Sequence, residues 1–210
     1  MLVVMSIIAV LVGLILSINS LVQKKQGLAR AETEIQALSA GCENYKADNA
    51  AYPESTDTDA LNAKTDGDSS ADKYYKASLA LYRALSGDMN GDGKVDSTDG
   101  TFGLDGKAIA PPPTTPTVPK SYAPDFFKPN RLGGTKVSGK VTKVSYLMDP
   151  FGYSYGYSTA YQADLNKTPP VSPPTSGYNP TFDLWSTAGK TTTPTSGSPT
   201  DVTNVWVKNW

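Results

Sequence analysis

The chain has 210 residues, with 19 basic and 20 acidic side chains, so its formal net charge at pH 7 is −1. A near-neutral charge excludes the basic footprint of a nucleic-acid-binding protein, and no nucleic-acid partner is expected. Histidine is absent and Cys42 is the only cysteine, which removes the commonest general base, the commonest transition-metal ligand and any intrachain disulfide.

The sequence also lacks the short motifs of common enzyme classes. It contains no G-x-S-x-G element and no glycine-rich phosphate-binding loop. We therefore predict that the protein is not an enzyme and has no small-molecule substrate. The 18 glycines and 16 prolines indicate that much of the chain forms loops around a modest core.

The N-terminal segment is apolar, and Lys24 is its first charged residue. A helix over residues 1–22, at about 1.5 Å per residue, would reach about 33 Å and cross a hydrocarbon core of about 30 Å. A cleaved signal peptide is the alternative, but it would need a basic start, a shorter apolar core and a small-residue cleavage site. We therefore predict a retained transmembrane helix over residues 1–22.

The predicted helix continues as an amphipathic stem over residues 23–52. Apolar residues recur seven apart, with companions between them: Leu21, Leu28, Ile35 and Cys42, then Ala31, Leu38 and Tyr45. Charged residues, Glu34 included, fall mostly off this stripe. Pro53 is the first proline and disfavours helical geometry at Tyr52. We expect one helix of about 45 residues whose second half packs on the chain's own head, with Cys42 as a packed apolar thiol.

Residues 53–140 read as a variable insertion that starts with a polar loop over 57–72. Four apolar or aromatic residues then recur at helical spacing: Tyr75, Leu79, Tyr82 and Leu85. They predict a helix over about 71–86, with Ser69 and Asp72 as a capping box and Gly87 as the stop. Residues 110–119, APPPTTPTVP, form a predicted extended linker.

Residues 88–99, DMNGDGKVDSTD, follow the ligand spacing of an EF-hand calcium loop. Calcium takes about six to eight hard oxygen ligands, and this spacing wraps oxygens around one point. The predicted metal ligands are Asp88, Asn90, Asp92, Asp96 and Asp99 through side chains, and Lys94 through its backbone carbonyl. A solvated Asp/Asn/Gly turn is the alternative. No helix is expected after the loop, so Ca²⁺ would be structural rather than a signal.

Residues 141–210 are predicted to form a small antiparallel sheet. Alternating or β-branched segments predict strands at 141–148, 153–157, 181–185 and 204–207. The sequence DPFG at 149–152 predicts a tight turn between the first two strands. We expect the aromatic face of this sheet to pack on the stem.

Motifs at both ends of the chain resemble the major pseudopilin of type II secretion systems, a type IV pilin-like family whose prepilins are methylated at the N-terminus. LVVMSIIAVLVGL is similar to the family's N-terminal helix core, and YKADNAAYP is similar to its helix end. DPFG, two spaced tyrosines, FDLWS and a terminal tryptophan follow in the family's order. The family's processing glycine and glutamate would lie upstream of Met1. The loop at 88–99 resembles those of dockerin modules over its own length.

The resemblance implies a pilin-like α+β fold and a structural subunit of a type II secretion pseudopilus. Such a subunit crosses the bacterial inner membrane once, carries its head in the periplasm and polymerises into a homo-oligomeric helical filament. Its implied partners are membrane lipid before assembly, an inner-membrane assembly platform and the secretion channel. Two alternatives remain open: a type IV pilus or minor pilin used in adhesion, and a monomeric, membrane-tethered, calcium-stabilised binding module.

Overall fold

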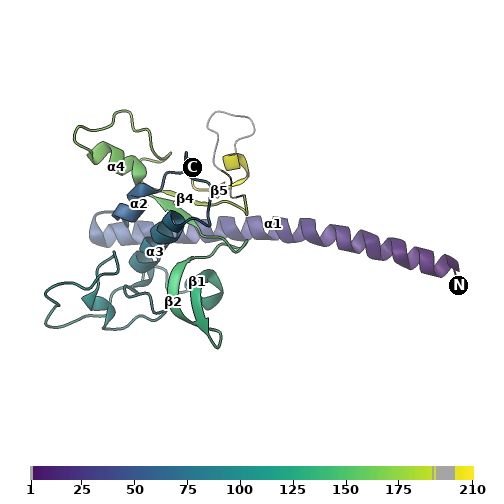
Figure 1. Cartoon of the computed structure of the whole chain (residues 1–210), viewed down its shortest axis with the longest axis horizontal. Helices are drawn as coiled ribbons and strands as arrows, with labels where there is room; N and C mark the ends of the chain where they lie inside the picture. The colour runs from purple at the N-terminus through teal and green to yellow at the C-terminus, as the bar shows by residue number, and fades with distance from the viewer. Residues whose placement is uncertain (1, 191, 193–201) are drawn as a thin grey trace.

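The computed structural model describes the backbone of residues 2–190, 192 and 202–210, and the side chains of this part from residue 22 onward. The protein is α+β, as predicted. A long N-terminal helix lies against a head built from shorter helices, an antiparallel hairpin and a small antiparallel sheet. Figure 1 shows the helix running along the head and extending well beyond it.

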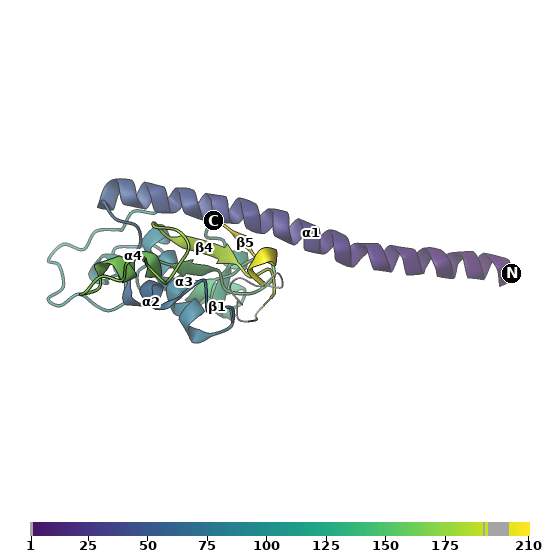
Figure 2. The ribbon, with the colours of Figure 1, turned by 90° about the horizontal axis from the view of Figure 1, so that it is seen from above.

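Helix α1 spans Leu2–Asn49 without a break, 48 residues in all. Its C-terminal part lies along the head and its N-terminal part projects away, as Figures 1 and 2 show from two directions. The helix ends where Ala50 adopts a positive φ of 61°, while its N–H still donates to Lys46 O at 2.8 Å. The prediction of one long helix is confirmed, with its end at Asn49 rather than at Tyr52.

The side of α1 that faces the head is the predicted apolar stripe. Its buried members are Ala31, Ile35, Leu38 and Cys42. Its half-buried members are Leu28 and Tyr45. Burial raises the pKa of the Cys42 thiol, which therefore behaves as a packed apolar group, as predicted. The side chain of Leu21 lies outside the described residues.

Two helices follow in the segment after α1. Helix α2 spans Thr56–Ala60, where the sequence analysis expected only loop. Ser55 caps it, because Thr58 N donates to Ser55 Oγ at 3.3 Å while Ser55 N donates to Thr58 Oγ1 at 2.8 Å. This reciprocal box uses threonine at the third helical position rather than the glutamate or glutamine that signals it in sequence.

Helix α3 spans Asp72–Ser86, as predicted, and ends at Gly87 in the left-handed region with φ 84°. The predicted capping box at its start is wrong. Ala71 is the N-cap and has no side-chain hydrogen bond, while Ser69 is buried and pairs with Thr187 Oγ1 at 2.9 Å. Ser69 therefore ties this loop to the sheet instead of starting the helix.

An antiparallel hairpin precedes the main sheet. Strand β1 spans Leu132–Val137 and pairs with β2, Lys140–Leu147, across a turn at Ser138 and Gly139 that both have positive φ. The sheet-forming region therefore begins before residue 141, within the predicted insertion. Short 3₁₀ turns lie at Asp99–Thr101 (η1) and Pro129–Arg131 (η2).

The second sheet has the strand order β3-β4-β5 and is antiparallel. Its strands span Gly156–Ser158, Asp183–Ser186 and Val207–Lys208. Helix α4, Ala160–Asn166, follows β3. The strand predicted at 204–207 is wrong at its start, because Val202–Val205 forms a 3₁₀ helix, η3, and only Val207 and Lys208 pair with β4.

The core lies between α1, α3 and the strands. Its larger cluster joins Leu38 and Cys42 of the stem to Leu81 and Leu85 of α3 and to residues of β2, β3 and β4. A smaller cluster surrounds Trp185 of β4. Because α3 packs against α1, β2 and β3, residues 53–140 contribute to the common core of the head.

Candidate functional site

The loop at 88–99 follows α3 directly, and its two end carboxylates are buried. Asp88 and Asp99 are both 0% exposed. Asp88 Oδ1 accepts from Gly91 N at 2.7 Å and Asp92 N at 3.1 Å. Its Oδ2 accepts from Gly93 N at 2.8 Å and from the Tyr82 hydroxyl at 2.6 Å. The first carboxylate of the loop therefore holds the backbone curled around it.

Asp99 closes the same loop from its other end. Its Oδ1 accepts from Asn90 N at 3.1 Å, and its Oδ2 accepts from Asp96 N at 2.8 Å. The first and last positions of the predicted ligand set are thus brought to the base of one closed turn. This closure is what the sequence spacing predicts.

Contacts with strand β2 fix the position of the loop on the head. Val144 N donates to Gly91 O at 2.7 Å. Gly93 has φ 84°, and a Cβ there would lie 2.9 Å from Val141 O. Glycine is therefore required at residue 93 both by the backbone conformation and by the close approach of β2.

The buried base of the loop holds two carboxylates that are hydrogen-bonded but have no cationic partner among the described residues. Burial raises the pKa of Asp88, and the neighbouring charge of Asp99 adds to the rise. Within the part of the chain that the structure describes, neither carboxylate forms an ion pair. Two buried carboxylates side by side are costly unless a cation neutralises them. The donor chemistry and the charge of this base therefore fit a hard cation such as Ca²⁺.

The remaining predicted ligands do not converge on that base. Asn90 Oδ1 accepts from Asp92 N at 2.8 Å, and Asp92 Oδ1 accepts from Lys94 N at 2.9 Å. Asp96 is exposed and bonds Thr98. Among the described residues, no three or more carboxylate or thiol groups are placed to hold one metal ion. The structure thus brings Asp88 and Asp99 together. The side chains of Asn90, Asp92 and Asp96 instead accept hydrogen bonds from the backbone of the loop itself.

A second polar centre, which the sequence analysis missed, lies between the stem and the head. Glu34 was predicted off the apolar stripe but is only 3% exposed. Its Oε1 pairs with Arg30 Nε at 2.8 Å and Arg131 Nε at 3.1 Å, and its Oε2 accepts from the Tyr155 hydroxyl at 2.8 Å. The stem is therefore fastened to η2 and to the segment before β3 through one neutralised carboxylate.

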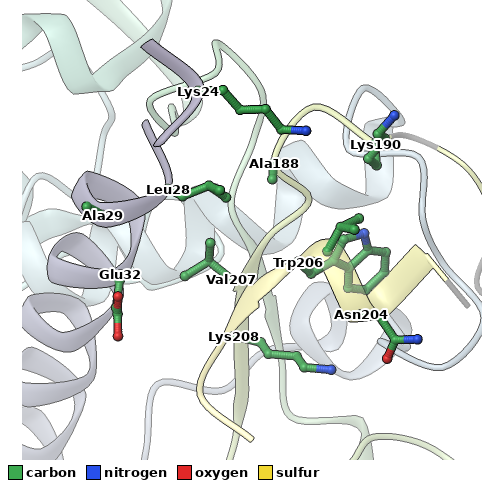
Figure 3. A pocket seen from close by; sticks show the side chains of 11 residues that line it. Lys24, Leu28, Ala29, Glu32, Ala188, Lys190, Asn204, Trp206, Val207 and Lys208 are labelled. Carbon is green, nitrogen blue, oxygen red and sulfur yellow. The ribbon is translucent and has the colours of Figure 1, made fainter. Parts of the chain in front are cut away.

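A groove runs along α1 beside the C-terminal segment. Two adjoining cavities of about 630 and 490 Å³ share Glu32, Val207 and Lys208 in their walls. We call them together the stem groove. Residues 24–39 of α1 form one wall, and residues 204–210 form the other, joined at the wide end by Ala188 and Lys190. Figure 3 shows its wide end, where side chains from α1, η3 and β5 face one another. No motif in the sequence signals this groove, because it arises from packing between distant segments.

The predicted transmembrane segment, residues 1–22, lies almost entirely outside the side chains that the structure describes. Within the described residues, no helix has both the length and the apolar composition that a bilayer crossing requires. The backbone of this segment is part of the continuous helix α1.

Comparison of the chain with known protein families, with characterised proteins and with solved structures found no match. The resemblance to pilin-like proteins therefore rests on the sequence motifs alone. The structure adds the α+β architecture, the long helix and the position of the head along it.

Proposed function

We propose that the protein is a filament-forming subunit of the pilin-like class, with a head carried on a helical stem. The observation that supports this proposal most directly is the division of α1. Residues 31–42 bury one side against the head, while the N-terminal part of the same helix extends beyond it (Figure 2). The two parts belong to one helix, but the head covers only one of them. The part that extends beyond the head therefore needs a different kind of partner.

The apolar sequence of the projecting part determines what its partner must be. Residues 1–22 are apolar around the whole helix, whereas an amphipathic helix has one polar side. Such a helix is stable in a bilayer before assembly, or surrounded by copies of itself after assembly. In the filament the helices leave lipid for a helix bundle, so close van der Waals packing rather than hydrophobic burial drives association.

The contacts between the stem and the head support the proposal of a subunit that transmits force. Glu34 and its two arginine partners hold the middle of the seated part. Near its end, Asn49 Nδ2 donates to the Tyr122 hydroxyl at 3.0 Å, and Lys120 pairs with Asp48. Polar links along the seat, together with the buried stripe, fix the angle between stem and head.

The motifs at both chain ends direct this proposal toward a type II secretion pseudopilus. In that role the growing filament, assembled on an inner-membrane platform, assists protein export through an outer-membrane channel. A type IV pilus or minor pilin is the second candidate, supported by the same helix motif. Electron microscopy of cells separates the two, since long surface fibres indicate a pilus, while loss of secretion without fibres indicates a pseudopilus.

Calcium enters the proposal as a structural ion of the head. The buried pair Asp88 and Asp99, which no cation of the described residues neutralises, supports it. Asn90, Asp92, Asp96 and the Lys94 carbonyl are the further ligands from the sequence pattern. Bound Ca²⁺ would neutralise the buried base and hold the loop against β2. Melting of the protein with calcium and with a chelator tests this assignment.

Cysteine crosslinking in membranes tests the filament proposal. In a Cys42→Ala background, two cysteines are placed in each chain, chosen in pairs from Ile7, Ile8 and Leu11, and oxidation is followed on a denaturing gel. Each thiol forms one disulfide, so two per chain are needed to link more than two subunits, and a filament then gives a ladder of oligomers. Monomers alone would exclude assembly and favour the tethered binding module.

A further inference from the structure

The wide end of the stem groove is lined by cationic side chains over an apolar floor. Leu28 of α1 and Val207 of β5 form part of the floor. Lys24 and Lys190 reach over the same end of the groove, and Lys208 lies toward its other end (Figure 3). Within the described residues, none of these three lysines forms an ion pair. The wide end therefore carries positive charge that no acid among the described residues pairs with.

A buried donor without a partner lies at the same end. Trp206 is only 5% exposed and stacks on Trp185, with ring centroids 5.9 Å apart. Among the described residues, its Nε1–H has no hydrogen-bond acceptor. Figure 3 shows this nitrogen on the edge of the indole that faces Ala188 and Lys190. Since a buried N–H without an acceptor is costly, the arrangement indicates that an acceptor comes from outside the described chain.

The chemistry of the missing acceptor follows from these groups. Lys24, Lys190 and the Trp206 indole are all donors, and the two ammonium groups favour an anion. A phosphate offers only acceptors and suits such a set, while the apolar floor suits the hydrocarbon next to it. Glu32, the acid of the groove, points away from the lysine pair (Figure 3).

The position of this end of the groove identifies the source of the phosphate. Lys24 directly follows the uncharged run that we assign to the bilayer. In Figure 2, η3 and β5 lie at the end of the head from which α1 projects. Lysines and tryptophans are the side chains that gather where a helix leaves the hydrocarbon, and each lysine near an anionic surface strengthens attachment.

We propose that the wide end of the stem groove binds the head group of an anionic phospholipid in the bilayer that α1 enters. Lys24 and Lys190 hold the phosphate, and Trp206 Nε1 donates to it. This inference rests on the proposed membrane-anchored subunit. Binding would draw the head against the membrane before assembly, and it would be released when the subunit leaves lipid for the filament.

The test measures the reactivity of individual lysines in the full chain reconstituted into vesicles. Vesicles of phosphatidylcholine alone are compared with vesicles that also contain phosphatidylglycerol, using an amine-acetylating reagent and mass spectrometry. We expect phosphatidylglycerol to lower the reactivity of Lys24 and Lys190 several-fold. The exposed Lys107 and Lys128 serve as internal controls and should react equally in both vesicles.

Variants separate the head-group site from general charge. K24Q/K190Q should abolish the lipid-dependent contact of the head, followed as quenching of tryptophan fluorescence by brominated phosphatidylglycerol. The matched variant K107Q/K128Q, with the same loss of charge, should retain it. W206F keeps a stacked ring but removes the N–H, and it should weaken protection of Lys190 without lowering the melting temperature in detergent.

Equal reactivity of Lys24 and Lys190 in both kinds of vesicle would overturn the head-group site. If Lys24 and Lys190 become less reactive as the amount of protein per vesicle rises in phosphatidylcholine alone, a second copy of the chain occupies the groove. That result would also overturn the head-group site. Flotation with phosphatidylcholine vesicles tests the anchor separately. If the protein floats but phosphatidylglycerol has no effect, the head-group site is wrong and the membrane anchor stands. If phosphatidylglycerol has an effect but the protein does not float with phosphatidylcholine, the membrane anchor is wrong and the anion-binding site stands.

Discussion

The two parts of α1 belong to one continuous helix but differ in what surrounds them. The seated part buries an apolar stripe and one charged residue, Glu34, against the head, and its outer side is polar and exposed. The projecting part, residues 1–22, has an apolar sequence on every side. This difference shows that packing on the head stabilises only the seated part. The stability of the projecting part depends on what surrounds it outside the head.

The largest effect should come from the seated stripe. Leu38→Ala removes a fully buried side chain, and we expect the free energy of unfolding of the head to fall by about 3 kcal/mol. The matched variant Leu11→Ala, in the projecting part, should leave head stability unchanged. Chemical denaturation in detergent, followed by tryptophan fluorescence, measures both. Equal losses of unfolding free energy in Leu38→Ala and Leu11→Ala would contradict the division of α1 into a seated and a projecting part.

Calcium should stabilise the head and leave the projecting part unaffected. At a free concentration one hundred times the dissociation constant, a ligand that binds only the folded state adds about 2.7 kcal/mol. We expect chelation to lower the melting temperature of the head accordingly. D92N/D96N should abolish the shift, and Asp125→Asn, an exposed control, should keep it. An identical melting curve with and without chelator would contradict the metal assignment.

Glu34 and Glu32 offer a matched pair within the same helix. Glu34→Gln breaks the pairs with Arg30 and Arg131, and we expect a loss of about 2 kcal/mol, since hydrogen bonds to charged groups contribute in this range. Glu32→Gln lies on the exposed side and should change stability by less than about 0.5 kcal/mol. Thermal unfolding compares the two; similar effects would mean that the buried contact contributes little.

The smallest effect concerns helix α4 and the loop that follows it, far in sequence from the stem. Asp164 accepts from Lys167 Nζ at 2.6 Å and Ser176 N at 2.8 Å, and these bonds hold its pKa below the usual value. A lowered pKa in the folded state gives stability that is present above about pH 3.9 and is lost as pH falls further. We expect Asp164→Asn to cost about 1 kcal/mol at pH 7.

The pH dependence supplies the check on that carboxylate. The stability difference between the native protein and D164N should shrink as pH falls below about 4, because protonation removes the same interactions. Urea denaturation at a series of pH values measures it. A difference that stays constant down to the acid limit would show that the Asp164 charge is not involved.

Elements that depend on local sequence were predicted well. The long helix followed from heptad spacing without proline, and α3 followed from helical spacing with Gly87 as its stop. The turn at 149–152 also formed, since Asp149 Oδ1 accepts from Phe151 N at 2.9 Å and Tyr153 N at 2.8 Å. In each case the residues that determine the element lie within it or beside it.

Elements that depend on distant partners were missed. Glu34 is charged and was expected outside, but Arg131 and Tyr155 neutralise and bind it once the head folds. Strand β1 begins with Leu-Gly-Gly and has two irregular points in its register, so no alternation marks it. The spacing of the loop at 88–99 predicts that its two ends come together, and Asp88 and Asp99 do, whereas Asn90, Asp92 and Asp96 bond their own backbone, which spacing alone does not determine.

In the proposed filament, copies of the chain surround the projecting part of α1. The most direct measurement is a scan of single cysteines over residues 7–16 in the Cys42→Ala background, with crosslinking yield in membranes recorded at each position. We predict disulfide-linked dimers whose yield rises and falls about every 3.6 residues, because a packed helix presents one side to each neighbour. Monomers at every position, or a low yield without periodicity, would contradict the account.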